Sequence, residues 1–293
     1  MTTTMAGSRV GALAKVEVRR YATHPVFLVG AALWAVTTAI GVHNAKDDVY
    51  APPMSAAVFL GLFGVVVGFR LTRSLERAAE AVDVVPASLQ ERVGALLLAA
   101  LLPGALGLVS AVVCLTVPDA AGDWAYGTWS GGERAAIVVA MAAGSALGGP
   151  LLGVMSARWL RFPGAVVVPV VAVSAWGIVG NGWTANNQDS LGWLLVRLFS
   201  PFAFFTTLDT DPGKPHAVES WRGNPWFFLL WVLLLCAFAA VVALLKDAEG
   251  ATAASLRRAL VVVVVLALAS FALAVVTGPD HASISSSTGT SRL

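Results

Sequence analysis

The chain has 293 residues, of which 57% are hydrophobic and only 12% are charged. Soluble domains carry about 25% charged residues, so this composition excludes a soluble globular protein and indicates several membrane spans. Its two cysteines, Cys114 and Cys236, both fall inside apolar runs, where packed thiols are more typical than a disulfide or a metal site.

Seven apolar runs contain no Asp, Glu, Lys or Arg: residues 26–42, 54–69, 93–117, 135–157, 163–182, 223–245 and 259–279. A bilayer core of about 30 Å is crossed by ~20 helical residues. Backbone groups in lipid must be paired within their own segment, so runs of this length become helices. We therefore predict an all-α polytopic membrane protein whose transmembrane domain, residues 25–279, has six core spans and a seventh at its C-terminal end.

The distribution of basic residues predicts the orientation. If the N-terminus is cytoplasmic, 13 of the 19 Lys and Arg residues fall on the cytoplasmic side of the seven runs. The positive-inside rule favours this arrangement. Ala, Val, Gly and Arg are used in place of Ile and Lys, as in bacteria with G- and C-rich genomes. We expect a multi-pass protein of a bacterial plasma membrane.

The N-terminal segment predicts a helix in the inner membrane interface. Residues 1–8 are expected to be disordered. Residues 9–24 contain a helix that ends before His24 and Pro25, with apolar positions on one side. Its charged residues, Lys15, Glu17, Arg19 and Arg20, suit contact with lipid headgroups. The alternative is a basic flank that only fixes topology.

The second and third runs are joined by the most highly charged cytoplasmic stretch, residues 70–92. Oppositely charged residues spaced three apart predict a helix in its first part. Val85 and Pro86 interrupt that helix, and Ser88 with Glu91 forms a capping-box pattern that starts the next one. The segment is therefore expected to be structured.

Small residues spaced four apart predict close helix packing in the second and fourth runs. They are Gly64, Gly68, Gly144, Gly148, Gly149 and Gly153. Packing within the chain and a dimer face both remain open for these glycines. Pro103, Pro150 and Pro169 are interpreted as kinks rather than as broken transporter helices.

Residues 182–222 form the longest external segment. Its apolar part, residues 191–206, is short and contains Arg197 and Pro201, which favours a re-entrant or interfacial hairpin over a span. A polar loop follows. The Ser- and Thr-rich tail, residues 280–293, is expected to be disordered.

The sequence lacks the common motifs for nucleotide binding and metal binding. It has no phosphate-binding G-x-x-x-x-G-K-[ST] loop, no H-E-x-x-H and no paired-cysteine motif. We therefore expect no catalytic residues, no cofactor and no metal in this chain, and no nucleic-acid partner. The absence of ionisable residues from the runs also disfavours a secondary transporter.

The basic N-terminal helix, the charged 70–92 segment with its Pro-Ala-Ser-x-x-Glu-Arg entry, and the long external segment resemble the membrane subunits of type-2 ATP-binding-cassette (ABC) exporters. The likeness covers about residues 8–246. It implies an all-helical permease with six core spans, paired with a second permease copy or a paralogue. ATP and Mg²⁺ would then bind to a separate cytoplasmic ABC-type ATPase.

The resemblance also implies a contact surface for that ATPase within the 70–92 segment. The residues carried over to it are Arg70, Arg73, Glu76, Arg77, Glu80, Asp83, Val85, Pro86, Glu91 and Arg92. The simpler interpretation of these charges is a solvated helix that sets topology. The cargo would be hydrophobic or amphipathic and would leave the cell.

Two properties of the chain have alternative interpretations. The run 259–279 departs from a six-span pattern, so the C-terminus lies outside if that run spans and inside if another run does not. The competing function is a membrane protein that binds a partner, as an assembly or sensor subunit, without moving cargo.

Overall fold

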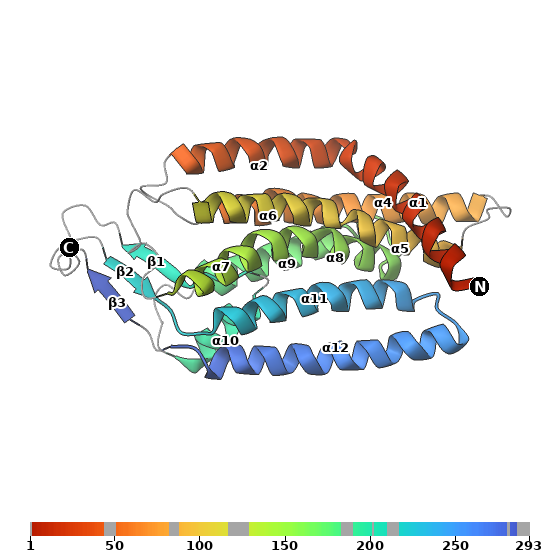
Figure 1. Ribbon diagram of the computed structural model, residues 1–293. Helices are drawn as coiled ribbons and strands as arrows, with labels where there is room; N and C mark the ends of the chain where they lie inside the picture. The colour runs from red at the N-terminus through yellow and green to blue at the C-terminus, as the bar shows by residue number, and fades with distance from the viewer. Residues whose placement is uncertain are drawn as a thin grey trace.

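A computed structural model describes residues 2–43, 51–81, 88–116, 129–182, 190–200, 202–209, 217–279 and 282–285. Within these ranges, six helical segments are long and apolar enough to cross a membrane. They run roughly parallel in one bundle, with a small sheet beyond one end (Figure 1). The prediction of an all-α polytopic membrane protein is confirmed.

The six long segments are built from the following elements. The first is α2 (Pro25–His43). The second joins α3 (Ala51–Ser55), the π-helical η1 (Ala56–Leu62) and α4 (Phe63–Ala81), and the third joins α5 (Leu89–Ala99) and α6 (Leu101–Thr116). The fourth joins α7 (Gly131–Val139), the π-helical η3 (Ala140–Gly144) and α8 (Ser145–Trp159). The last two are α11 (Pro225–Leu245) and α12 (Gly250–Val276).

Helix α1 (Thr2–Ala22) lies at the end of the bundle that we call the α1 end, where it packs against α5 (Figure 1). It stops as predicted before His24, and α2 begins at Pro25, which needs no backbone donor at a first helical position. Its start differs from the prediction, because α1 begins at Thr2 and Ser8 lies inside the helix. Residues 2–8 thus continue the helix that was expected to begin after them.

The run 163–182 gives a shorter helix than the other six runs. Pro163 and Gly164 form a turn, with Gly164 at φ 78°, so α9 (Val167–Gly182) begins late and has 16 residues. At 1.5 Å per residue it is about 24 Å long, less than the ~30 Å of a bilayer core. The run 259–279, by contrast, lies within the long helix α12.

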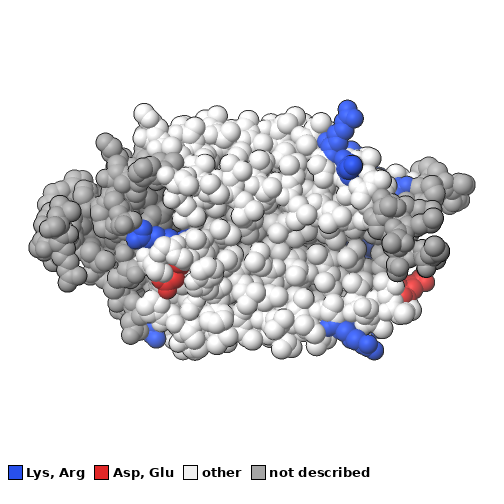
Figure 2. Space-filling model, viewed as in Figure 1, with Lys and Arg blue, Asp and Glu red and all other residues white. Residues whose placement is uncertain are grey.

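Burial separates central from peripheral helices. In the spans over residues 52–78 and 131–159, 61% of the residues in an apolar 18-residue stretch are buried. In the span over 250–276 the corresponding share is 17%. Figure 2 shows a broad band without charged residues across the middle of the face in view, with charges near its two ends. This pattern fits a bilayer around the middle of the bundle.

The other end of the bundle, which we call the sheet end, carries the external segment. Helix α10 (Leu191–Phe199) packs there against α9 and α12. Strands β1 (Thr206–Asp209) and β2 (Ala217–Ser220) pair antiparallel within the predicted polar loop, with Thr206 opposite Ser220. Strand β3 (Ala282–Ser285) pairs with β2, so this part of the tail is ordered where disorder was predicted. The rest of the tail lies outside the described residues.

Candidate functional site

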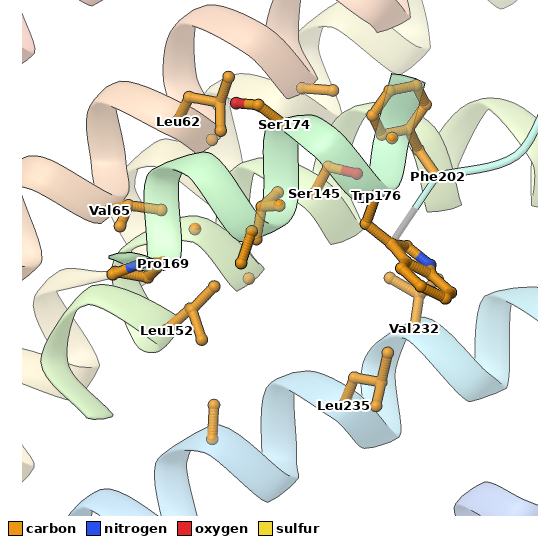
Figure 3. Close-up of a pocket in the computed structure, with 18 of the residues that line it drawn as sticks. Leu62, Val65, Ser145, Leu152, Pro169, Ser174, Trp176, Phe202, Val232 and Leu235 are labelled. Carbon is orange, nitrogen blue, oxygen red and sulfur yellow. The ribbon is translucent and has the colours of Figure 1, made fainter. Parts of the chain in front are cut away.

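A large apolar cavity lies among the long helices. Its volume is about 970 Å³, at the upper end of the range for small-molecule sites. Its walls come from η1 and α4, from η3 and α8, and from α9 and α11. Figure 3 shows Leu62 and Val65 on one side, Leu152 of α8 below them, and Leu235 of α11 across the space. None of its lining residues is charged, so its chemistry suits an apolar ligand.

Both π-helical segments contribute to this cavity. Segment η1 supplies Ala57, Val58, Gly61 and Leu62 to the wall, and η3 supplies Gly144. A π turn inserts one extra residue per turn and widens the helix locally, and such turns are often found at functional sites. The irregular parts of the two most buried spans therefore shape the cavity.

Aromatic rings close the cavity toward the sheet end. Phe199 of α10 packs against Trp176 of α9 and Trp231 of α11, with ring centroids 5.4 and 5.5 Å away. Phe271 of α12 adds a further ring 5.2 Å from Trp231. Trp231 lines the cavity and is 4% exposed, and its indole Nε1 has no hydrogen-bond partner in the structure as described.

Helices α4 and α8 pack at backbone distance along a glycine seam. A Cβ at Gly64 would lie 2.7 Å from Pro150 Cδ. Cβ atoms at Gly149 and Gly153 would collide with the carbonyl oxygens of Gly61, near the end of η1, and of Val65 in α4. Such close approach, which small residues permit in membranes, makes the two helices one rigid unit.

All six glycines singled out in the sequence lie at contacts between helices of this chain. Gly68 faces the Pro150 carbonyl, which completes the seam with α4. Gly144 and Gly148 of the fourth span instead face Val232 and Cys236 of α11. Helix α8 therefore lies between α4 and α11, and it packs closely on both.

An ionic cluster joins three parts of the chain at the α1 end of the cavity. Arg158, which is completely buried at the end of α8, forms an ion pair with Asp247, and its Nη1 lies 3.9 Å from Glu76 Oε1 on α4. Lys246 lies 3.8 Å from the same Glu76 oxygen and donates to the Arg158 carbonyl. Arg73 pairs with Glu76 at 3.2 Å. A buried arginine needs such partners, because an isolated buried charge is costly.

The same cluster touches the cavity. Arg73 Nη2 donates to the carbonyl of Leu160 at 2.9 Å, and Leu160 and Ser156 line the cavity on either side of Arg158 in the sequence. Helix α4, the end of α8 and the α11–α12 turn are thus tied together next to the cavity.

The residues predicted to contact an ATPase fall into three groups. Arg73 and Glu76 bind within the chain, whereas Arg70 and Arg77 are exposed on α4. Glu91 completes the predicted capping box by accepting from the Ser88 backbone at 2.8 Å, and half-buried Arg92 follows it. Asp83, Val85 and Pro86 lie outside the described residues, as does the side chain of Glu80.

The charged residues of α1 are also divided. Lys15 and Arg19 are exposed, as residues in contact with lipid headgroups would be. Glu17 is buried and pairs with Arg20 at 2.9 Å, and Arg20 also donates to Ser74 of α4 at 2.8 Å. One side of α1 is therefore attached to α4 by the hydrogen bond from Arg20 to Ser74.

Sequence reasoning missed the roles of Arg158, Lys246 and Asp247; it counted Arg158 and Lys246 only as topology-setting charges. Their partners are distant in the sequence: 82 positions separate Arg158 from Glu76, 89 separate it from Asp247, and 170 separate Lys246 from Glu76. The sequence held one signal for this cluster, the position of Arg158 and Lys246 at the ends of predicted spans. Long basic side chains at such positions extend toward the membrane interface, where the ends of several helices meet.

His24 and Lys246 are among the titratable groups at the α1 end whose pKa values are shifted. Partial burial lowers the pKa of the His24 imidazole, and nearby Arg70 lowers it further. Partial burial also lowers the pKa of Lys246, with repulsion from Arg161 and Arg158 acting the same way and Glu76 and Asp247 acting against them. Both shifts disfavour the charged form.

Metal-ligating side chains do not gather anywhere in the described ranges, where no group of three or more His, Cys, Asp or Glu residues could hold an ion. Comparison with known proteins gives no match, whether to a family model, a curated protein or a solved structure. Function is therefore inferred from the chain's own geometry.

Proposed function

We propose that this chain is the permease subunit of an ATP-driven ABC exporter that moves a hydrophobic or amphipathic cargo out of the cell. A separate ATPase subunit would bind ATP and Mg²⁺ at the α1 end, taken as cytoplasmic. One observation carries the proposal: α4 and α8 both line the apolar cavity and hold the ionic cluster at its α1 end.

The packing couples the helices of this arrangement so that they move together. The glycine seam leaves little room for α4 to slide on α8, because backbone atoms meet there. The cluster adds the α11–α12 turn through Lys246 and Asp247. A push on the exposed end of α4 would therefore move α4, α8 and α11 together.

Helix α9 is the part of the cavity wall that is not held in this unit and can move relative to it. It is short, and it packs far less on α4 and α8 than those helices pack on each other. Its outer face is open, with Val171 and Ile178 more than half exposed. Displacement of the rigid unit relative to α9 would widen or close the cavity.

The surface on which a partner would push is basic. Arg70 and Arg77 are exposed on α4, while Arg73 and Glu76 behind them stiffen the helix. We therefore expect acidic side chains on the ATPase to face Arg77, with a second permease copy or a paralogue completing the transporter.

Co-purification with a candidate stand-alone ABC ATPase tests the proposal. Arg77→Glu should weaken the complex, whereas Arg257→Glu, which reverses an exposed charge on α12, should leave it intact. Replacing Arg73, Glu76 and Arg77 together by Ala should abolish ATP-dependent transport in proteoliposomes.

Two outcomes count against the proposal. Undiminished co-purification and transport in the triple variant would refute the coupling surface. A stable complex that never moves cargo would favour the competing role, a partner-binding assembly or sensor subunit.

A further inference from the structure

We infer that a second, smaller cavity at the α1 end binds the phosphate of an anionic glycerophospholipid from the leaflet on that side. This headgroup cavity lies where α1 packs against α5 and meets α4 (Figure 1). All three helices contribute to its lining, and two of the lining residues are arginines, Arg20 and Arg92. The inference goes beyond the proposed function and does not depend on it.

Arg92 of α5 brings an unpartnered positive charge to the headgroup cavity. In the described ranges its guanidinium forms no hydrogen bond and no ion pair. The side chain is half-buried, and none of its nitrogens is among the enclosed unpaired atoms, so they remain open to a ligand. A guanidinium presents five N–H donors in a planar fork that matches the oxygens of a phosphate.

Arg20 of α1 adds a second guanidinium, which is held in place by its neighbours. Its Nη1 donates to both Glu17 carboxylate oxygens, at 2.9 and 3.1 Å, and its Nη2 donates to Ser74 Oγ of α4 at 2.8 Å. Glu17 and Ser74 line the same cavity, so these bonds hold the guanidinium at its wall. The Nε–H of Arg20 has no partner in the part of the chain that the structure describes, and it is not enclosed.

The charge balance of the cavity favours a phosphodiester. Glu17 neutralises Arg20, with which it pairs at 2.9 Å, so Arg92 leaves the lining with a single net positive charge. A lipid phosphodiester carries a single negative charge, whereas a phosphomonoester carries about −1.5 to −2. Lys15 and Arg19, exposed on α1, add a positive potential that favours lipids with a net negative charge.

The apolar part of the lining favours a lipid over a soluble anion. Leu13 of α1 and Leu75 of α4 line the cavity together with the two arginines. Val16, a neighbour of Leu13 on the helix surface, is 56% exposed, which suits a helix at the boundary between headgroups and acyl chains. The volume of about 220 Å³ gives room for a headgroup but not for a whole lipid. Basic cavities between spans bind anionic headgroups in this way.

Native mass spectrometry of the purified chain, with no ATPase present, tests the inference. The probes are dioleoyl phosphatidylglycerol and dioleoyl phosphatidylcholine, which have the same acyl chains. Phosphatidylglycerol should bind more tightly as the first lipid. Arg92→Gln should weaken its binding by roughly tenfold or more, the value of a hydrogen bond to a charged group. Arg258→Gln, which removes an exposed charge on α12, should leave the binding of this first lipid unchanged.

A pair of variants on α1 tests the location. Leu13→Glu places a carboxylate in the headgroup cavity and should abolish the preference for phosphatidylglycerol. Ala12→Glu makes the same addition of charge at the adjacent exposed position and should keep the preference. Equal effects of the two Glu substitutions, or equal binding of the two lipids by the wild type, would overturn the inference.

Two soluble probes separate a lipid site from a site for free anions. They are inorganic phosphate and glycerophosphoglycerol, which is the phosphatidylglycerol headgroup without acyl chains. At concentrations that match the lipid, neither should displace phosphatidylglycerol. Displacement by either probe would identify a soluble anion as the ligand and overturn the inference. Because no ATPase takes part, failure of the exporter proposal would leave this result standing.

Discussion

Replacing a single glycine of the seam with alanine tests whether the second span, η1 with α4, and α8 form a rigid unit. At Gly149 the added Cβ would collide with the Gly61 carbonyl, a backbone atom that cannot rotate away. At the adjacent Gly148 it would lie 3.4 Å from Cys236 Sγ, an ordinary contact. The two variants thus make the same chemical change in neighbouring positions and differ only in what the methyl group meets.

The expected magnitudes follow from that difference. Overpacking costs about 1–3 kcal/mol, and a backbone clash belongs at the upper end of that range. Alanine improves helix propensity by about 1 kcal/mol at either site. Gly149→Ala should therefore destabilise the protein by roughly 2 kcal/mol, and Gly148→Ala should be neutral or stabilising by up to about 1 kcal/mol.

Thermal unfolding in detergent measures both effects. At about 2–4 °C per kcal/mol, Gly149→Ala should lower the Tm by roughly 4–8 °C, and Gly148→Ala should not lower it. Equal Tm values for the two variants would show that the seam yields easily and that the second span and α8 do not form a rigid unit.

Two further changes probe the α1 end. Arg158→Met leaves Glu76 and Asp247 without their buried partner. It should destabilise the protein by about 3 kcal/mol, a value discounted for the partial exposure of Asp247. In thermal unfolding, Arg161→Met at an exposed site should change stability by less than about 0.5 kcal/mol. His24 accepts from the Val26 backbone through Nδ1 at 3.3 Å and has a lowered pKa, so the unfolded chain binds its proton first as pH falls below about 6.5. Stability should therefore decline on acidification through that range. His24→Gln should reduce the decline in a pH series of unfolding curves, and an unchanged slope would contradict this assignment.

The helices were predictable because the bilayer requirement acts locally. An uncharged run of sufficient length must pair its own backbone groups, whatever surrounds it. The break at His24–Pro25 and the Ser88–Glu91 capping box were predictable for the same reason, since each depends on neighbours within a few residues. The length of α9 was overestimated because Pro163 and Gly164 were counted as part of the apolar run. In the structure they form a turn, and the helix begins after it.

The candidate site depended on contacts between distant segments, which a single sequence does not contain. Glycine spacing indicated close packing, but only the folded structure identifies Pro150 as the neighbour of Gly64 and Gly68. Arg73 and Glu76 have the spacing of an exposed helical pair, yet Arg73 reaches a carbonyl 87 residues away. The cavity arises where two π-helical segments and the short α9 fail to fill space together, a property of the assembled bundle.

The ATP dependence of Cys236 labelling tests the coupling of the α1 end to the cavity most directly. Cys236 is a buried cavity-lining residue, and with Cys114 replaced by Ala it is the chain's one thiol. In a complex with the ATPase, ATP should change its labelling rate by a small membrane-permeant maleimide severalfold, and Arg77→Glu should abolish that change. A rate that is the same with and without ATP would contradict the account.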